Sequence, residues 1–416
     1  MACYQSRFKL AAACAVLVMT APNAFAQETW TCATDSAWYA PLSHHAAVAF
    51  GGLMWVLCGQ EGSTPIPYVR YSSDGIVWHE TGPYPPPYEA RCSPAAVVFG
   101  GGMWILGGWN GTGNLRDVWS SLNGLEWVCK TANAGWTARD MHAAVAHNGR
   151  IWVIGGYDGE CRNDVWSSAN GIDWACATPA AEWAPRAALA AVTFAGRIWV
   201  LGGSDQYSTF NDVWWSEDGA EWTEATPSAA WCSRDLHACA ASDSLMWILG
   251  GRDNGDSFLN DVWRSSDGTA WTCITDSAEW NPRAAFATLS IGQTLCVLGG
   301  WGYASNNDVW TSTVGAVSDA HRSLGPRAAD WRTTTPFRYG THIFGVTRTA
   351  GRVRVTIRDV QGREVALLDD ATLQPGVHQL EWSGRDDLGR RAPPGVYTLV
   401  VEADGRSASA RLVMLR

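Results

Sequence analysis

Short hydrophobic runs separated by polar turns follow one another along most of the chain. The runs are four to seven residues long and rich in β-branched and aromatic residues, and they alternate with polar positions or are apolar throughout. Asn-Gly, Asp-Gly and Gly-Gly pairs separate them, which is typical of antiparallel strands joined by hairpins. None is long enough for a helix, so the pattern predicts an all-β protein.

Six of these runs are versions of one segment. They are MWVLCG (54–59), MWILGG (103–108), IWVIGG (151–156), IWVLGG (198–203), MWILGG (246–251) and LCVLGG (295–300), at spacings of 47 to 49 residues. Each unit holds four predicted strands, and so small a sheet cannot bury both of its faces alone. The repeat therefore predicts a six-bladed β-propeller, in which the sheets stack around an axis.

The two ends of the repeat array predict how the ring closes. The sixth unit ends after Thr313 without a fourth strand, and residues 29–38 match residues 270–278 nearly position by position. We therefore expect an N-terminal strand to complete the last blade, because this removes open sheet edges.

Tryptophan fills equivalent positions of the units. Of the 26 Trp residues, 21 occupy four repeated positions. A large flat side chain suits the wedge-shaped gap between blades, and so we interpret these residues as structural. They are Trp38, Trp136, Trp183, Trp231 and Trp280; Trp55, Trp104, Trp152, Trp199 and Trp247; Trp119, Trp166, Trp214, Trp263 and Trp310; and Trp30, Trp78, Trp127, Trp174, Trp222 and Trp271.

A known family shares this order of motifs. The shared pattern is Arg-x-x-His/Ala or a related run, then an apolar strand that ends in Gly-Gly, and then Asn-Asp-Val-Trp, with single positions replaced in some units. The pattern resembles the kelch repeat and the propeller domain of galactose oxidase-like proteins, and we place this propeller at residues 27–315. The copper chemistry of galactose oxidase needs a Tyr-Cys crosslink and two His ligands in particular positions, and we do not place that set in this sequence, so we expect no cofactor.

The C-terminal part of the chain has a different pattern. The repeat is lost in a Ser-, Pro-, Gly- and Arg-rich linker at residues 316–335, and residues 336–416 predict a small β-sandwich. This segment resembles FlgD-type Ig-like modules, and similar modules serve as sorting domains of the type IX secretion pathway. The resemblance implies export to a bacterial cell surface, with the export machinery as a partner; a passive stabilising domain is the alternative.

The N-terminus predicts the compartment. Residues 1–26 have basic residues, an apolar run and a small-x-small cleavage signature, which is typical of a signal peptide. We therefore expect an extracytoplasmic, secreted or surface protein without a transmembrane segment. The mature chain holds ten Cys, which we interpret as small buried hydrophobes, with disulfides as the alternative.

Charge excludes one class of partner. The chain contains only two Lys, and residues 27–315 contain 13 Arg and Lys against 29 Asp and Glu, a balance of −16. An acidic propeller repels anionic polymers, so nucleic acid is not expected as a partner.

Five of the propeller's basic residues share one repeated position, directly before the innermost strand, and Pro41 interrupts the series in the first unit. These side chains are expected to ring one mouth of the channel, the mouth that kelch propellers use for binding. One interpretation is an Arg-lined site for a carboxylate-bearing or polar ligand. The other is that each Arg ties its own loop to a carbonyl or to a carboxylate such as Asp140 or Asp235. The five are Arg91, Arg139, Arg186, Arg234 and Arg283.

The loops that follow each Gly-Gly pair are expected on the same face. They differ between units, and an invariant scaffold with variable loops is how binding surfaces are usually built. The candidate ligand-binding residues in these loops are Trp109, Tyr157, Asp158, Asp205, Arg252, Asp253 and Trp301.

Two further sets of residues resemble metal-binding or catalytic residues. His44, His142 and His237, three residues after the Arg position in units one, three and five, could form a three-His metal site. Metal ligands must converge within about 2.0–2.1 Å of the ion, so we expect structural histidines and no metal. The repeated aspartates of Asn-Asp-Val-Trp are expected to cap hairpins; they are Asp117, Asp164, Asp212, Asp261 and Asp308.

These observations lead to one functional hypothesis and two alternatives. The hypothesis is a secreted or cell-surface, non-catalytic binding protein whose propeller mouth recognises a protein or glycan partner. The first alternative is a carbohydrate-active hydrolase or oxidase with acids from Asp158, Asp205 and Asp253. The second is an architectural surface protein.

Overall fold

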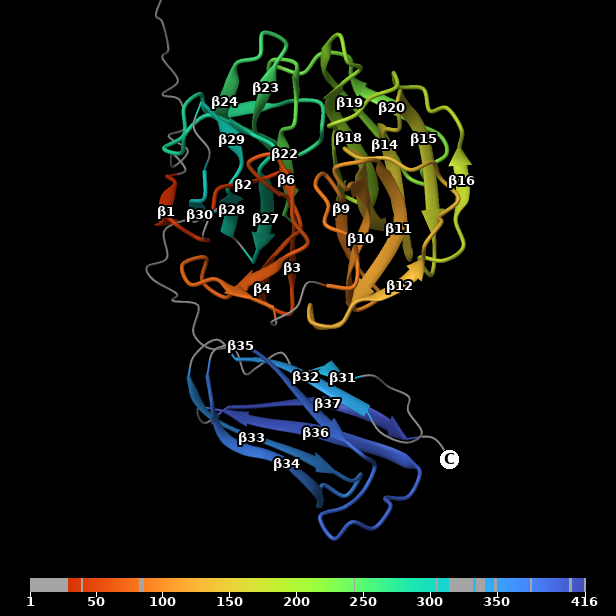
Figure 1. The fold of residues 1–416 in the computed structure, drawn as a ribbon, viewed down its shortest axis with the longest axis vertical. Helices are drawn as coiled ribbons and strands as arrows, with labels where there is room; N and C mark the ends of the chain where they lie inside the picture. Colours follow the sequence, from red (N-terminus) through yellow and green to blue (C-terminus); the bar gives the residue numbers. More distant parts are fainter. Residues whose placement is uncertain are drawn as a thin grey trace, which may run out of the picture.

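The computed structural model describes residues 29–313 except 39, 82–85, 243, 293 and 304–305, and residues 332–414 except 334–340, 348–349, 375 and 404–405. The described parts are built from strands and contain no helix (Figure 1). No helix that could span a membrane is found among them. The predicted signal peptide lies outside the described residues.

Six antiparallel blades of four strands each form the first domain, as predicted, and β21 (Arg234–Asp235) joins blades four and five into one nine-stranded sheet. Blade one comprises β3 (Ala46–Phe50), β4 (Leu53–Leu57), β7 (Val69–Ser72) and β8 (His79–Glu80). Blade two comprises β9 (Ala95–Phe99), β10 (Gly102–Trp109), β11 (Asn114–Ser121) and β12 (Val128–Thr131). Blade three comprises β13 (Ala143–His147), β14 (Arg150–Tyr157), β15 (Cys161–Ser168) and β16 (Ala175–Thr178).

The second half of the ring repeats this order. Blade four comprises β17 (Ala190–Phe194), β18 (Arg197–Ser204), β19 (Thr209–Ser216) and β20 (Thr223–Thr226). Blade five comprises β22 (Ala238–Ala241), β23 (Met246–Asp253), β24 (Phe258–Ser265) and β25 (Thr272–Thr275). Blade six comprises β27 (Ala287–Ile291), β28 (Thr294–Leu298), β30 (Val309–Thr313) and, from the start of the chain, β1 (Thr31–Thr34).

The ring closes as the sequence predicts. Strand β1 pairs antiparallel with β30, with Thr31 opposite Thr311 and Cys32 opposite Trp310. The innermost strands contact one another in the closed order β3, β9, β13, β17, β22, β27 and back to β3. Six blades therefore surround one axis, and the last is built from both ends of the propeller.

Short strand pairs lie beyond the inner ends of several blades. Each pairs the residues at the repeated Arg position with those that follow the Gly-Gly pair. They are β2 (Leu42–Ser43) with β5 (Gln60–Glu61) and β6 (Thr64–Pro65), β21 (Arg234–Asp235) with the end of β23, and β26 (Arg283–Ala284) with β29 (Trp301–Gly302). We call this end of the channel the mouth.

Tryptophan packs between neighbouring blades, which supports its structural interpretation. Trp55 of blade one is buried, and its indole Nε1 donates to the carbonyl of Phe50 at 3.0 Å. Its ring lies against Gly124, in the last turn of blade two, where φ is +76° and a Cβ would overlap the indole. The same contact recurs between Trp104 and Gly171, Trp152 and Gly219, and Trp199 and Gly268.

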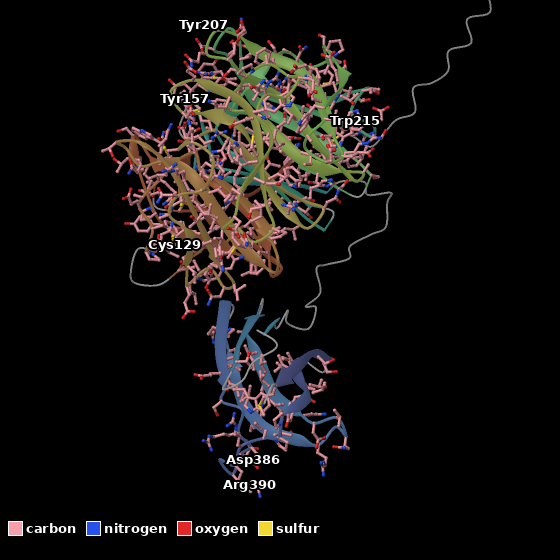
Figure 2. The ribbon with its side chains drawn as sticks, turned by 90° about the vertical axis from the view of Figure 1, so that its right-hand side faces the viewer. Cys129, Tyr157, Tyr207, Trp215, Asp386 and Arg390 are labelled. Carbon is pink, nitrogen blue, oxygen red and sulfur yellow. The ribbon has the colours of Figure 1, made fainter. Side chains whose placement is uncertain are left out.

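Seven of the ten cysteines form two sets that differ in exposure, which corrects part of the sequence interpretation. Cys58, Cys92 and Cys296 are buried, as small hydrophobes would be. The cysteines of the repeated Trp-x-Cys position are exposed, because this position faces outward on the outermost strand of the blade; Figure 2 labels one of them, Cys129. They are Cys32, Cys129, Cys176 and Cys273. All ten cysteines among the described residues are free thiols.

The second domain is a two-sheet sandwich. One sheet contains β31 (Arg332–Thr333), β32 (Thr341–Thr347) and β35 (Gly376–Trp382), and the other contains β34 (Glu364–Leu373), β33 (Gly351–Arg358), β36 (Gly395–Ala403) and β37 (Arg406–Met414). Trp382 and Tyr397 meet edge to face at 5.0 Å between the sheets. Asp386 and Arg390, labelled in Figure 2, form an ion pair of 2.9 Å in the loop between β35 and β36. Because β31 belongs to this fold, the domain begins inside the predicted linker.

Candidate functional site

A closed ring of backbone hydrogen bonds surrounds the axis at the mouth. One residue from each blade takes a left-handed conformation, with φ between 49° and 52°. The amide of each donates to the carbonyl of its counterpart in the preceding blade, at 2.7 to 3.2 Å. The six residues are His44, Ser93, Met141, Ala188, Leu236 and Ala285. Because only backbone atoms make these links, the side chains at this position are free to differ between blades.

The repeated arginines lie behind this ring and are fully buried. In blade three, Nη1 and Nη2 of Arg139 donate to the two carboxylate oxygens of Asp164 at 2.6 and 2.9 Å. Nη1 also donates to the carbonyl of Gly155, and Nε donates to the carbonyl of Thr137. The equivalent ion pairs, Arg91–Asp117, Arg186–Asp212, Arg234–Asp261 and Arg283–Asp308, measure 2.6 to 2.7 Å.

This geometry corrects the expectation that Arg91, Arg139, Arg186, Arg234 and Arg283 form a ligand-binding mouth. Enclosed guanidinium groups whose donors are already used cannot meet a ligand. Each Arg instead ties its own blade together, through the Asn-Asp-Val-Trp aspartate and not through Asp140 or Asp235. That aspartate also accepts from the indole two residues later, as Asp164 does from Trp166 at 2.7 Å, so it does more than cap a hairpin.

Two of these ion pairs lower the pKa of their aspartate. Burial acts to raise the pKa of Asp164, but the hydrogen bond and charge of Arg139 outweigh it and hold the pKa below its usual value. The pKa of Asp308 is lowered in the same way, against burial, by Arg283. Asp164 and Asp308 are therefore charged partners of Arg139 and Arg283.

Blade one replaces both members of the pair. The register of β2 with β5 places Leu42, and not Pro41, at the Arg position, and the register of β4 with β7 places Tyr68 at the Asp position. Removing both partners together avoids an unpaired buried charge. The sequence comparison misplaced this position by one residue.

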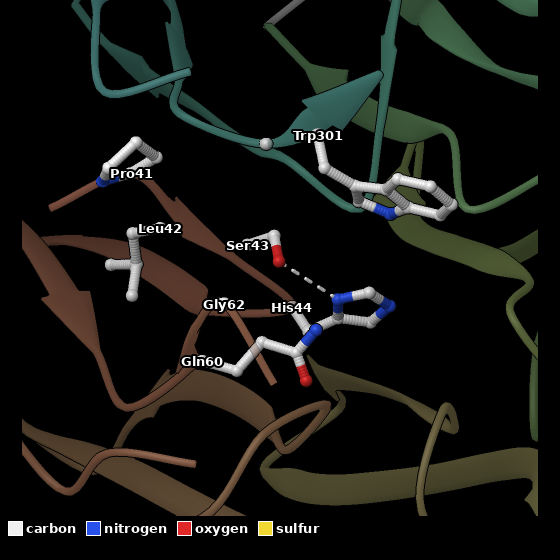
Figure 3. A pocket seen from close by; sticks show the side chains of 8 residues that line it. Pro41, Leu42, Ser43, His44, Gln60, Gly62 and Trp301 are labelled. Carbon is white, nitrogen blue, oxygen red and sulfur yellow. Dashed lines mark hydrogen bonds between the residues drawn. The ribbon is translucent and has the colours of Figure 1, made fainter. Parts of the chain in front are cut away.

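Two cavities at the mouth share His44 and Gln60 in their linings. The larger, of about 680 Å³, is also lined by Trp109, Tyr157 and Asp158 of the predicted set. The smaller, of about 220 Å³, is lined by Trp301 and shown in Figure 3. The remaining predicted residues, Asp205, Arg252 and Asp253, line neither of these two cavities.

His44 stands between the two cavities. Its Nδ1 lies 3.2 Å from the hydroxyl of Ser43 (Figure 3), and its ring stacks on Trp301 with 6.4 Å between centroids. Burial, aided by the charge of Arg252, lowers the pKa of His44 to about 4. The imidazole is therefore neutral at neutral pH and offers a ligand hydrogen bonding and stacking without charge.

The loop carboxylates proposed as acids hold their own loops. Asp205 accepts from the amides of Tyr207 and Ser208 at 3.0 and 2.9 Å. Asp253 accepts from two amides of its own loop in the same way, each at 2.8 Å. Asp158 accepts from the hydroxyl of Thr137 and, at 2.8 Å, from Nε of Arg162. Burial acts to raise the pKa of Asp158, but these two hydrogen bonds outweigh burial and lower it. A general acid needs a raised pKa, so the lowered pKa of Asp158 argues against this role for that residue. Asp205 and Asp253 serve as acceptors for the amides of their own loops.

The histidines do not form one set. The residue of blade one that corresponds to His142 and His237 is His45, since each contacts the second glycine of the Gly-Gly pair. Burial lowers the pKa of each of these three to about 3, so they are neutral packing residues. His44 faces the mouth instead, and no three His, Cys, Asp or Glu side chains of the described residues are grouped to hold a metal ion.

One carboxylate at the mouth was overlooked as a site. Asp140 lines the larger cavity, is only 8% exposed, and its Oδ1 has no hydrogen-bond partner among the described residues. Burial raises its pKa to about 6. No sequence signal distinguishes Asp140 from Asp235, because both follow a repeated Arg and they differ in the residue that strand pairing brings opposite each of them.

Comparison with protein families supports the reading of the repeats. Residues 121–300 match the KLHDC2/KLHL20/DRC7 Kelch-repeats domain, and residues 90–120 match the Kelch motif. Residues 334–407 match the FlgD Ig-like domain. No curated protein matches the chain.

Proposed function

We propose that this chain, which carries a kelch-repeat β-propeller followed by an FlgD Ig-like domain, is a non-catalytic binding protein whose mouth recognises a protein partner. Kelch propellers are protein-binding scaffolds. In this propeller, the variable side chains at the mouth do not make the repeated contacts that hold the blades together. The repeated Arg, Asp and Trp side chains, by contrast, form ion pairs, hydrogen bonds and buried packing contacts within and between the blades.

The observation that carries the proposal is the larger cavity at the mouth. It is lined by side chains from blades one, two and three that differ between blades, among them Gln60, Trp109 and Tyr157. Partly buried aromatic rings beside hydrogen-bonding groups are typical of protein-binding hot spots. A cavity of about 680 Å³ accommodates a few side chains of a partner.

Export to a bacterial cell surface is part of the proposal. The signal-like segment at residues 1–26 and the FlgD Ig-like domain support it. We expect the C-terminal domain to contact the export or attachment machinery, which leaves the propeller mouth for the partner.

A glycan partner is the second candidate, and one observation favours it. Trp301 and Tyr303 both contact Phe258 edge to face, at 4.9 and 5.2 Å, and Tyr303 is 77% exposed. Aromatic faces of this kind stack on sugar rings. We prefer the protein partner because the larger cavity is lined by Trp109 and Tyr157, and not by Trp301 or Tyr303.

The test compares capture of partners from the cell envelope by three versions of the chain. The mouth variant carries Trp109→Ala and Tyr157→Ala. The matched control carries Val128→Thr and Ile172→Thr, at positions 57% and 50% exposed on the outside of blades two and three. A partner held by wild type and control but lost by the mouth variant, and then shown to bind directly when purified, supports the proposal. Binding that the mouth variant retains contradicts it, and retention of glycans alone favours the second candidate.

A further inference from the structure

Two aspartates of the mouth occupy the same position in blades three and five. Asp140 and Asp235 each follow a buried Arg and precede a residue of the hydrogen-bonded ring. Each lies opposite the residue that follows its Gly-Gly pair, which is Tyr157 for Asp140 and Arg252 for Asp235. The two blades thus present one carboxylate in two different surroundings.

In blade five the carboxylate is fully partnered. Asp235 accepts from Nη2 and Nε of Arg252 at 2.9 and 3.2 Å, and from the hydroxyl of Ser204 in the preceding blade at 3.0 Å. The two donors from one guanidinium form the forked pairing that matches carboxylate geometry. This position of the fold therefore accommodates a guanidinium beside its carboxylate.

In blade three both partners are replaced by aromatic residues. Tyr157 stands in place of Arg252, and Trp109 stands in place of Ser204. The Oδ1 atom of Asp140 has no hydrogen-bond partner in the described part of the chain, although the residue is more than nine-tenths buried. A buried carboxylate without a partner is costly, and here it lines a cavity that both aromatic residues also line.

The cavity holds no spare positive charge among its described residues. Arg139 forms an ion pair with Asp164, and Arg162, next to the cavity, forms an ion pair with Asp158. His44 is neutral at neutral pH because burial lowers its pKa. The negative charge of Asp140 is therefore left for a group from outside the chain.

We propose that Asp140, with Trp109 and Tyr157, forms a cation-binding subsite that takes the guanidinium group of an arginine side chain from the protein partner. This inference rests on the proposed function, because it names the partner group that the mouth would bind. Arg252 in blade five shows the pairing within the same fold. Aromatic rings beside the carboxylate favour a guanidinium, which is weakly hydrated and stacks on aromatic faces.

The experiment uses the full chain and small probes at pH 7.5 and fixed salt. N-acetyl-arginine amide is the probe, and N-acetyl-citrulline amide is its neutral counterpart of nearly equal shape; calorimetry measures their binding. We expect the arginine probe to bind at least tenfold more tightly than the citrulline probe. Equal binding of the two probes overturns the inference, and N-acetyl-lysine amide binding as tightly as the arginine probe overturns the guanidinium assignment.

Variants locate the site. Asp140→Asn should weaken binding of the arginine probe at least tenfold, whereas Asp256→Asn, an equal charge change at an exposed residue of the mouth, should leave it within twofold. Tyr157→Arg copies blade five and supplies an internal guanidinium; we expect a folded protein that no longer binds the probe. Tyr157→Arg retaining full binding overturns the inference even if Asp140→Asn fails to fold.

Failure of the inference and failure of the proposed function are distinguishable. If the partner is lost from the Trp109→Ala, Tyr157→Ala variant but the arginine probe does not bind, the mouth is a protein-binding site without a guanidinium subsite. If the probe binds as expected but the partner is captured through another surface, the subsite stands and the proposed function does not.

Discussion

The backbone amide of His44 donates a 2.9 Å hydrogen bond to the carbonyl of Ala285, which joins the first blade to the last. The propeller is thus closed twice, once at its outer edge by the pairing of β1 with β30 and once at its axis by this link. Because all six links of the axial ring need a left-handed residue, the ring carries backbone strain that the packed blades hold in place.

Replacing a ring alanine with glycine tests this strain. Glycine adopts positive φ without the Cβ penalty, so Ala285→Gly should be neutral or raise the free energy of unfolding by up to about 1 kcal/mol. Ala287→Gly, two residues later in strand β27, should lower it by about 0.5–1 kcal/mol. Denaturant unfolding of both variants measures the difference, and equal destabilisation would contradict a strained ring.

Breaking one buried ion pair should destabilise the propeller strongly. Arg186→Leu leaves Asp212 without its bidentate partner, and we expect a loss of about 3–5 kcal/mol. Adding Asp212→Tyr copies the Leu42 and Tyr68 arrangement of blade one and should recover part of that loss. Urea unfolding followed by tryptophan fluorescence measures both variants; a double variant as unstable as the single one argues against this account.

The ionisation of Asp140 should make stability and binding depend on pH. Burial raises the pKa of Asp140 to about 6, so its contribution to stability is present below the unfolded value and is lost as pH rises through 6. Asp140→Asn should remove this loss, of about 3 kcal/mol. Binding of the arginine probe should strengthen as pH rises from 5 to 7.

Other groups near Asp140 do not titrate in this range. Burial raises the pKa of Cys92 to about 11 and lowers those of His44 and His142 to about 4 and 3. Asp158 remains ionised beside Arg162. A binding profile that is flat between pH 5 and 7 would therefore contradict the role given to Asp140.

The buried histidines should make the propeller sensitive to acid. His45, His142 and His237 have pKa values lowered to about 3 by burial, so only the unfolded state takes up protons as pH falls below about 6.5. Stability should fall by about 2 kcal/mol per histidine between pH 6.5 and 5. His142→Leu, which copies Leu189 of blade four, should reduce this fall by one histidine's share. The free energy of unfolding of the wild type and of His142→Leu is measured at pH 6.5 and at pH 5. If the variant loses as much stability as the wild type over this range, the prediction is wrong.

Thiol reactivity should separate the exposed cysteines from those whose pKa burial raises to about 12. The four exposed cysteines of the Trp-x-Cys position should react with N-ethylmaleimide in the folded protein. Cys58, Cys239 and Cys296 should be protected, because burial raises their pKa values to about 12. Peptide mapping by mass spectrometry reads out each site; rapid labelling of Cys296 without unfolding would argue against the packing described.

The repeat made the architecture predictable from sequence. A segment such as IWVIGG, recurring at nearly constant spacing, specifies a strand that only its neighbours can bury. The match between residues 29–38 and 270–278 was enough to predict that β1 pairs with β30. Local chemistry decides these features, because turns, strand propensity and the aromatic positions all agree within each unit.

Roles that depend on partners distant in sequence could not be predicted in this way. The sequence shows Arg139 at a repeated position, but only folding places it against Asp164 and away from solvent. Likewise, residue spacing places Pro41 at the Arg position of blade one, but the register of β2 with β5 shows that Leu42 occupies it.

The role of the candidate site also depends on partners that are distant in sequence. Asp140 and Asp235 look alike along the chain, and what distinguishes them is the residue that pairing brings opposite, Tyr157 or Arg252. The sequence by itself determined the blades, their number and the aromatic packing between them, since these follow from patterns repeated every 47 to 49 residues. Only the tertiary structure decided which charges are neutralised and which carboxylate is left for a ligand, because an ion pair depends on distances that the fold creates.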